Sequence, residues 1–191
     1  MANFTKEFQR NLQANVNQFS SEIEKQQEIL EGINTIMGQI KNNTPYHDSL
    51  GLKYASIAWT EEFNYVNSAF ETLKTYGFDL ISSDTVRESI IYLFNVEYVR
   101  ISNVIEKVSQ TEHHQLNALY VRYIEFDNNG NGVVIDSKRL NQDREFTNML
   151  SSRRIWKIDI INTYKDLIER SIKLSEMIER ELLDRAGDEE S

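Results

Sequence analysis

The sequence predicts an all-α fold, an elongated antiparallel up-down four-helix bundle with a broken second arm. Glycine and proline are scarce, with seven and one among 191 residues, so the chain has few places to turn. Apolar residues recur at spacings of three, four or seven, the pattern of a helix with one buried face. The few turn signals leave four arms, and an antiparallel bundle lets four arms share one core. We expect one domain, residues 1–185, and then a disordered acidic tail, residues 186–191.

The first arm is expected to be a single helix over residues 3–41. Glutamine, asparagine, glutamate and lysine fill the positions between its apolar residues, so one face should be buried and the others wet. Pro45 ends the arm because proline lacks the N–H and disfavours a helical residue before it. The apolar stripe consists of Phe4, Phe8, Leu12, Val16, Phe19, Ile23, Leu30, Ile33, Met37 and Ile40.

The second arm is broken into two pieces. Residues 48–59 predict a short helix, and residues 61–76 predict a clearer helix that ends at Gly77, where glycine suits a left-handed C-cap. Aromatic side chains are crowded into this arm, and at helical spacing they form a core more often than a binding platform. They are Tyr46, Tyr54, Trp59, Phe63, Tyr65 and Phe70.

A corner over residues 78–84 leads into the third arm. Thr85 has capping-box spacing to Glu88, and the serine or aspartate just before it is an alternative N-cap. Arg87 is expected to bond Asp79 or backbone carbonyl groups of the corner. We therefore assign structural roles to the corner residues Gly77, Asp79, Asp84, Thr85 and Arg87.

The third and fourth arms are expected to be long helices on either side of the sequence DNNGNG. This run is the strongest turn signal in the chain because glycine and asparagine tolerate left-handed backbone angles. We expect the third arm to be a helix from the corner to about Phe126, followed by the turn at 127–132 and a brief extended segment at 133–135. The fourth arm is expected to be a helix from Leu140 or Arg144 to Leu183, either continuous or broken near Ser151 and Ser152.

The turn resembles part of a calcium-binding loop. Asp127, Asn129 and Asn131 occupy positions one, three and five, where such a loop places oxygen ligands. The twelfth position, where a glutamate should complete the site, is Lys138, whose charge opposes metal binding. The sequence favours a plain turn, with weak calcium binding by Asp127, Asn129 and Asn131 as the alternative.

Charge and composition exclude several kinds of chemistry. The formal net charge is −9, with 21 basic residues dispersed among 30 acidic ones, so we expect no nucleic-acid binding. The cluster Arg153, Arg154 and Lys157 could hold an anion, but it is more typical of a solvated helical turn. The sequence has no cysteine, which excludes disulfides, thiolate catalysis and thiolate metal sites.

The sequence contains no recognisable catalytic or metal-binding constellation. His47, His113 and His114 lack the spacing to carboxylates that zinc and di-iron sites need. No Gly-x-Ser-x-Gly motif and no phosphate-binding glycine loop are present. We therefore expect no catalytic residues, no metal, no cofactor and no enzymatic activity.

The corner carries a resemblance to a known family. The residues concerned are Leu73, Gly77, Asp79, Leu80, Ile81, Ser82, Asp84, Arg87, Ile90, Tyr92 and Tyr98. They are similar to the signature of a Bacteroidota family of unknown function, and residues 43–52 and 143–182 are similar to further segments of it. Members typically have a short basic N-terminus, one membrane span and a helical domain without an assigned activity. The resemblance implies a transmembrane helix upstream of Asn3, which is absent from this chain.

These observations predict a non-enzymatic interaction or scaffold module of a membrane-anchored protein. The resemblance implies that the native protein is anchored in the inner membrane with this domain in the periplasm. Both termini of a four-arm bundle lie at one end, which suits a membrane stalk. A homodimer through the first or last helix and a different protein partner both remain open. The alternatives are a small-ligand sensor domain of the four-helix-bundle type and an enzyme with an unrecognised site.

Overall fold

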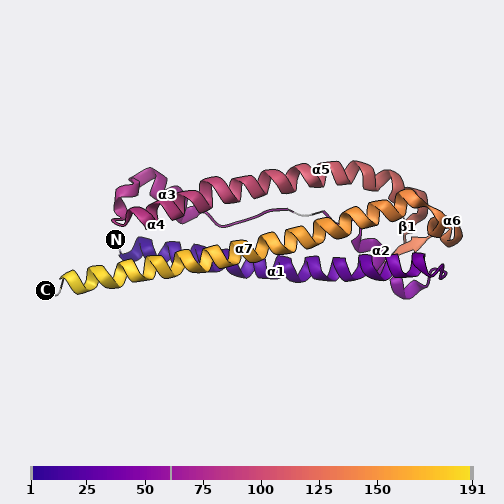
Figure 1. Cartoon of the computed structure of the whole chain (residues 1–191), viewed down its shortest axis with the longest axis horizontal. Helices are drawn as coiled ribbons and strands as arrows, with labels where there is room; N and C mark the ends of the chain where they lie inside the picture. The colour runs from indigo at the N-terminus through magenta and orange to yellow at the C-terminus, as the bar shows by residue number, and fades with distance from the viewer. Residues whose placement is uncertain (1, 61, 190–191) are drawn as a thin grey trace. The chain divides into compact units, whose positions relative to one another are not determined.

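The computed structural model describes residues 2–60 and 62–189, with side chains apart from those of residues 2–4, 111–117, 182 and 184–189. Helices account for the regular structure of these residues, together with one two-stranded sheet, so the predicted all-α class is confirmed. The ribbon in Figure 1 consists mostly of helices. The chain divides into two compact units. Unit 1 contains Met1–Glu22, Phe63–Val104 and Thr163–Ser191, and unit 2 contains Ile23–Glu62 and Ile105–Asn162. The single domain expected from the sequence stays a prediction.

Three long helices contribute residues to both units. They are α1 (Ala2–Lys41), α5 (Tyr98–Tyr123) and α7 (Arg144–Glu189). α7 has no break at Ser151 and Ser152. It also continues to Glu189, beyond the end expected at Leu183 and into the stretch where the sequence predicted a disordered tail.

Unit 1 is completed by several short elements between α1 and α5. They are α3 (Ser68–Tyr76), the 3₁₀ turn η2 (Phe78–Leu80), α4 (Asp84–Ile91) and the π-helical segment η3 (Tyr92–Glu97). Two expectations are corrected here. The helix predicted over residues 61–76 begins only at Ser68, because residues 62–67 have no helical hydrogen bonding. The long helix predicted from the corner to Phe126 is α4, η3 and α5, and it ends at Tyr123.

Aromatic side chains from four segments form the core of unit 1. Phe19 of α1 lies 5.6 Å from Phe63, 5.8 Å from Tyr98 and 5.6 Å from Tyr164, measured between ring centroids. Phe63 comes from the non-helical segment, Tyr98 from α5 and Tyr164 from α7. Such rings contribute large buried areas in tilted and edge-to-face pairs. The non-helical segment therefore supplies one of the four sides of this core.

Two buried asparagines of α1 hold the non-helical segment. The Asn15 side chain donates to the carbonyl of Val66 at 3.0 Å and accepts from the Val66 N–H. One turn earlier, Asn11 Oδ1 accepts from the N–H of Ala69 at 2.9 Å. These bonds satisfy backbone groups that have no helical partner. The expectation that the asparagines of this arm lie on wet faces is therefore wrong for Asn11 and Asn15.

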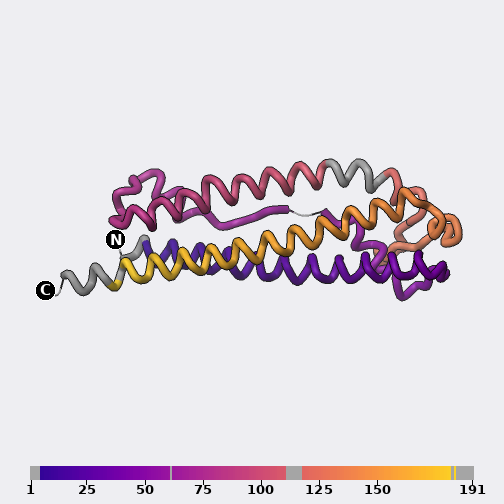
Figure 2. The backbone as a smooth tube through the Cα atoms, in the orientation of Figure 1, coloured from indigo at the N-terminus to yellow at the C-terminus, as the bar shows by residue number. Residues whose placement is uncertain are grey.

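Unit 2 contains a β-hairpin packed beside a short helix. Strands β1 (Ile124–Phe126) and β2 (Gly132–Val134) pair antiparallel, and α6 (Ser137–Gln142) leads from them into α7, as Figure 2 traces. The 3₁₀ turn η1 (Asp48–Leu50) and α2 (Gly51–Ser56) occupy the region of the predicted short helix. A Cβ atom added to Gly132 would lie 2.9 Å from Cβ of Tyr54, so glycine permits this close approach. The buried cluster of unit 2 is Ile29, Ile33, Ile36, Ile40, Tyr54, Ile57, Tyr120, Tyr123, Ile124, Val134, Leu140, Phe146 and Leu150.

Candidate functional site

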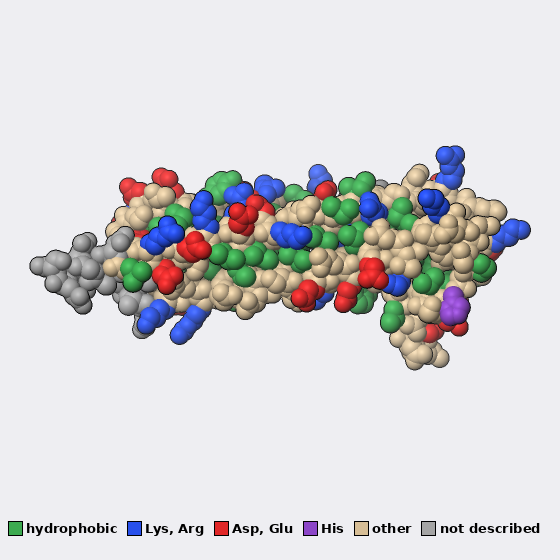
Figure 3. Space-filling view, turned by 60° about the horizontal axis from the view of Figure 1, so that its bottom comes forward, with side chains coloured by type: hydrophobic (Ala, Val, Ile, Leu, Met, Phe, Trp, Pro, Cys, Tyr) green, Lys and Arg blue, Asp and Glu red, His purple; other side chains and the backbone are tan. Residues whose placement is uncertain are grey.

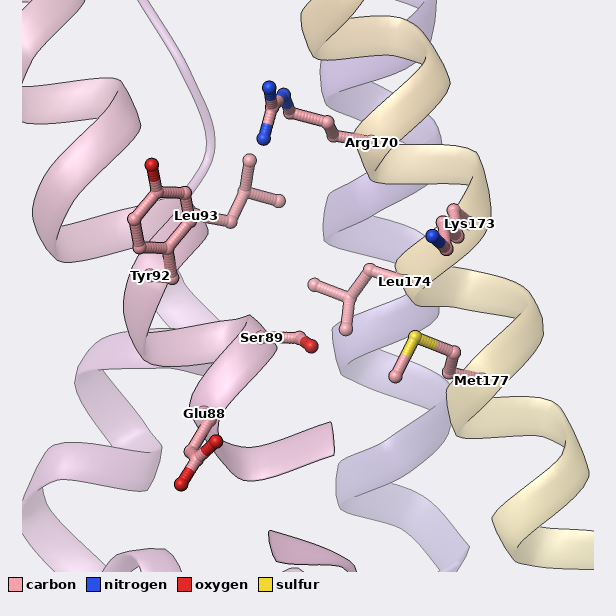
Figure 4. Close-up of a pocket in the computed structure, with 8 residues that line it drawn as sticks. All are labelled: Glu88, Ser89, Tyr92, Leu93, Arg170, Lys173, Leu174 and Met177. Carbon is pink, nitrogen blue, oxygen red and sulfur yellow. The ribbon is translucent and has the colours of Figure 1, made fainter. Parts of the chain in front are cut away.

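A groove in unit 1 is the candidate functional site (Figure 4). It lies between α4 and η3 on one side and the C-terminal part of α7 on the other, and its volume is about 460 Å³. The side chains of Leu93 and Leu174 point toward each other across it, with Arg170 toward one end and Glu88 at the other. The groove thus has an apolar floor between polar ends. Its lining residues are Glu88, Ser89, Tyr92, Leu93, Arg170, Lys173, Leu174 and Met177.

The π-helical segment η3 shapes one wall of the groove. Hydrogen bonds in a π-helix join residues five apart, and η3 brings the hydroxyl of Tyr92 to the carboxylate of Glu97. Glu97 is buried, and Arg100 Nη2 donates to its Oε2 at 2.8 Å. Hydrogen bonds from Arg100 and Tyr92 lower the pKa of Glu97 even though burial opposes this shift. The bond to Glu97 in turn raises the pKa of Tyr92.

Helix α7 supplies the cations of the groove. Arg170 and Lys173 are three positions apart and lie on the same side of the helix, followed by Leu174 and Met177. Arg170 Nε donates to Asp166 Oδ2 at 2.8 Å, and this bond raises the pKa of Arg170 and orients its guanidinium. Among the residues that the structure describes, no other acceptor bonds Arg170 and none bonds Lys173.

The hydroxyl groups of the groove are not arranged for nucleophilic attack. Ser89 Oγ donates to the carbonyl of Thr85 at 2.7 Å, so its proton is directed at the backbone of its own helix. The Tyr92 hydroxyl is directed at Glu97, whose carboxylate forms an ion pair with Arg100. An activated nucleophile needs an adjacent base that a third group orients. The described geometry suits recognition of a ligand better than covalent chemistry.

The groove residues lie outside the site residues expected from the sequence. A signal was present on α7, where Arg170, Lys173, Leu174 and Met177 have the spacing of one helix face. The opposite wall depends on η3, and no cap, glycine or proline marks that segment in the sequence. Helical periodicity alone therefore could not predict this wall.

The structure places the corner residues around the start of α4 and not in the groove. Gly77 has φ of 99° and ends α3, where its N–H bonds the carbonyl of Leu73. Its ψ of 145° differs from a left-handed helical cap. Ser83 is the N-cap of α4 and accepts from the N–H of Val86, so Thr85 does not cap this helix.

Arg87 of α4 forms a hydrogen bond and an ion pair with residues of the corner. Its Nη2 donates to the carbonyl of Ile81 at 2.8 Å, and its Nη1 lies 2.9 Å from Asp84 Oδ1. Of the two partners expected from the sequence, Arg87 therefore bonds a corner carbonyl, whereas Asp79 lies exposed in η2. This arrangement fixes the path of the chain into α4.

A carboxylate from α7 completes the corner and was not foreseen. Oε1 of Glu181 accepts from the N–H of Ser82 at 2.9 Å, from its hydroxyl at 2.6 Å and from the N–H of Ser83 at 3.1 Å. A negative charge at the first turn of a helix also complements its dipole. The corner is therefore held by bonds to α7 through the backbone of Ser82 and Ser83.

The candidate calcium loop is the turn of the hairpin in unit 2. Asp127 Oδ1 accepts from the N–H groups of Asn129 and Asn131, both at 2.8 Å, and its Oδ2 accepts from Asn131 Nδ2 at 2.9 Å. Hydrogen bonding from the Asn131 side chain is the main cause of the lowered pKa of Asp127. Both carboxylate oxygens thus bond their own turn. Weak calcium binding by Asp127, Asn129 and Asn131 stays a prediction.

The expectation that the basic cluster on α7 is a solvated helical turn is wrong for two of its three residues. Arg153 and Lys157 are buried in unit 2, with exposed fractions of 1% and 0%, and only Arg154 is exposed as a solvated turn would require. Arg153 Nη2 donates to the carbonyl of Trp59 at 2.8 Å. Burial lowers the pKa of Lys157 to about 7. The pattern of charges could not show this, because burial depends on what packs against the helix.

The aromatic residues of the second arm are divided between the two units. Tyr54 and Phe70 are buried, each in a different unit, whereas Trp59 is 59% exposed. His47 lies on the surface and caps η1 by accepting from the N–H of Ser49. The side chains of His113 and His114 lie outside the described residues. Within the described part of the chain, no three His, Cys, Asp or Glu residues are grouped so that they could hold a metal ion.

Comparisons with known proteins do not identify a family. The chain matches no protein-family model, no curated protein and no solved structure. Within the described residues, every helix is too short or too polar to cross a membrane. The resemblance to a Bacteroidota family therefore stays a prediction, and the geometry of the groove is the main evidence about function.

Proposed function

We propose that this chain is the non-enzymatic, extracytoplasmic domain of a membrane-anchored protein and that it acts as an interaction module. The groove between α4, η3 and α7 carries this proposal. It combines the buried apolar side chains of Leu93 and Leu174 with the exposed cations Arg170 and Lys173. Apolar surface supplies affinity and charged groups at its rim supply orientation.

The arrangement that we propose for the whole chain is an antiparallel four-helix bundle with a broken second arm. The core of unit 1 supports it, because Phe19, Phe63, Tyr98 and Tyr164 come from four segments and contact one another there. In this bundle the non-helical residues 62–67 and α3 take the place of a continuous second helix. The proposed anchor is a transmembrane helix upstream of this chain in the inner membrane.

The surface charge supports a protein or small-molecule partner over nucleic acid. On the face shown in Figure 3, acidic and basic side chains are interspersed, with hydrophobic side chains between them. The net charge of −9 also disfavours the neutralisation of phosphates. The partner that we propose is a second copy of the protein or a different protein.

Site-specific photo-crosslinking in cells tests the interaction module. A photoreactive phenylalanine analogue replaces Met177 in the groove of the native, full-length protein, and the control carries it at the exposed Lys165 of the same helix. We expect a discrete crosslinked species from position 177 that is absent from position 165. Adducts of a second copy and of another protein differ in mass. Identical adducts at both positions, or none at 177, would contradict the proposal.

A second candidate function is a small-ligand sensor. The observation that favours it is the groove volume of about 460 Å³, which falls within the roughly 300–1,000 Å³ typical of ligand sites. The apolar floor with a few polar groups also matches such sites. A sensor of this kind would bind its ligand in the groove of unit 1. The second-arm aromatics, for which the sequence left a binding platform as the less favoured interpretation, are divided between the two units.

A further inference from the structure

We propose that the groove of unit 1 binds a small amphipathic carboxylate, with its acid group at Arg170 and Lys173 and its apolar body on Leu93, Leu174 and Met177. This inference rests on the sensor function and names the chemical class of its ligand. It follows from three features of the groove, namely its floor, its cations and the position of its acids.

The floor of the groove is apolar. Leu93 and Leu174 are buried, and their side chains approach the groove from opposite walls (Figure 4). Met177 continues the apolar surface along α7, and its flexible thioether can adapt to ligands of different width. A ligand that gains affinity here must bring an apolar body, because a fully polar ligand would lose hydration without a replacement.

Arg170 lies toward one end of this floor, and Lys173 lies beside Leu174 on the same helix. The bond from Arg170 Nε to Asp166 fixes the guanidinium and leaves its two Nη groups without an acceptor in the described chain. Figure 4 shows this guanidinium above Leu93, with Lys173 one turn along α7. A pre-oriented guanidinium recognises a carboxylate through two parallel hydrogen bonds, and the ammonium of Lys173 adds a point charge.

Acids lie at both ends of the groove. At the Arg170 end, Asp166 bonds Nε of Arg170 and Glu97 interacts with it electrostatically. Glu97 is already engaged by Arg100 and Tyr92, so its charge does not compete for Arg170 by a direct hydrogen bond. Glu88 lines the other end of the groove and would repel an acid group placed there. A carboxylate is expected at the Arg170 end, where the Nη groups can bond it, with the apolar body extending past Leu174.

Binding of three matched eight-carbon probes tests the proposal. Sodium octanoate, 1-octanol and octylamine share an apolar chain and differ in the charge of the head group. We expect octanoate, used below its micellar concentration, to shift the amide NMR signals of residues 88–93 and 170–177 saturably. Octanol should bind about tenfold more weakly, because it lacks the charge-assisted hydrogen bonds, and octylamine should bind more weakly still.

Two groove variants and one matched control locate the acid group. Arg170→Gln and Lys173→Gln should each weaken octanoate binding by about fivefold and leave octanol binding unchanged. Lys165→Gln removes an exposed cation of the same helix outside the groove lining and should change neither. Equal binding by octanol or octylamine overturns the carboxylate assignment but leaves the sensor function in place. Binding by none of the three probes overturns both.

Discussion

The burial of Lys157 should make the stability of the protein depend on pH. Its side chain is fully buried on α7, one turn from the buried Arg153, and desolvation lowers its pKa from 10.5 to about 7. The unfolded chain therefore binds a proton at this lysine over a pH range in which the folded chain does not. The free energy of unfolding should rise with pH across that range.

We predict that raising the pH from about 7 to about 10 stabilises the protein through Lys157. The slope is at most about 1.4 kcal/mol per pH unit, because one proton is exchanged. Above about pH 10 the effect ends, because the lysine of the unfolded chain loses its own proton near its ordinary pKa of 10.5. Buried tyrosines such as Tyr98, whose pKa is raised to about 12, then lower the stability as their unfolded counterparts ionise. Urea unfolding followed by circular dichroism at several pH values measures the slope.

Lys157→Met should remove most of this pH dependence, since methionine fills a similar volume without a charge. Lys165→Met, an exposed lysine on the same helix, provides the matched control and should retain the slope. If both variants keep the slope of the parent protein, other groups cause it and the burial of Lys157 has no such effect.

At the scale of elements, periodicity predicted the long helices well and the second arm poorly. α1 begins and ends where the apolar stripe and Pro45 indicated, and the DNNGNG sequence forms a turn followed by β2. Residues 62–67 were read as helix, yet Glu62, Phe63, Asn64 and Tyr65 alternate between exposed and partly buried positions. An alternation with a period of two indicates an extended segment. This alternation covers only four residues, so the helical spacing of the flanking residues dominated the sequence-based prediction.

The candidate groove was harder to predict than the fold. Its α7 wall follows ordinary helical spacing, but its opposite wall depends on the π-helical pairing of Tyr92 with Glu97. The burial of two asparagines of α1 was equally hard to predict from the sequence. Asn11 and Asn15 are polar residues at positions next to the apolar stripe, and only the non-helical backbone that faces them explains why they are buried.

The non-helical segment should depend on Asn15 for its place in unit 1. We predict that Asn15→Ala lowers the free energy of unfolding by about 2–3 kcal/mol, because it leaves the N–H and carbonyl of Val66 without their partner and opens a small cavity. Asn17→Ala, an exposed asparagine of the same helix, should change it by less than about 0.5 kcal/mol. Urea denaturation of both variants decides this. Equal losses in the two variants would contradict this prediction, because the cost would then not come from the bond to Val66, and alanine is a better helix former than asparagine.

For the whole molecule, the main question is whether the two units unfold together. α1, α5 and α7 each pass from one unit to the other, at residues 22–23, 104–105 and 162–163. Neither glycine nor proline occurs at these positions, so nothing in the local sequence favours a break in the helices there. Splitting the units would require three helices to end where their hydrogen bonding is continuous.

We therefore predict that Asn15→Ala, made in unit 1, destabilises unit 2 as well. Native-state hydrogen exchange measures this through the slowest amides of each unit, for example near Tyr98 in unit 1 and near Ile33 and Leu150 in unit 2. These amides should lose the same free energy of protection, because global unfolding exposes both cores at once. A loss confined to unit 1 would show that the helices fray at the boundary and that the chain contains two independently folding parts. The single domain expected from the sequence would then be wrong, since each unit would have its own cooperative core.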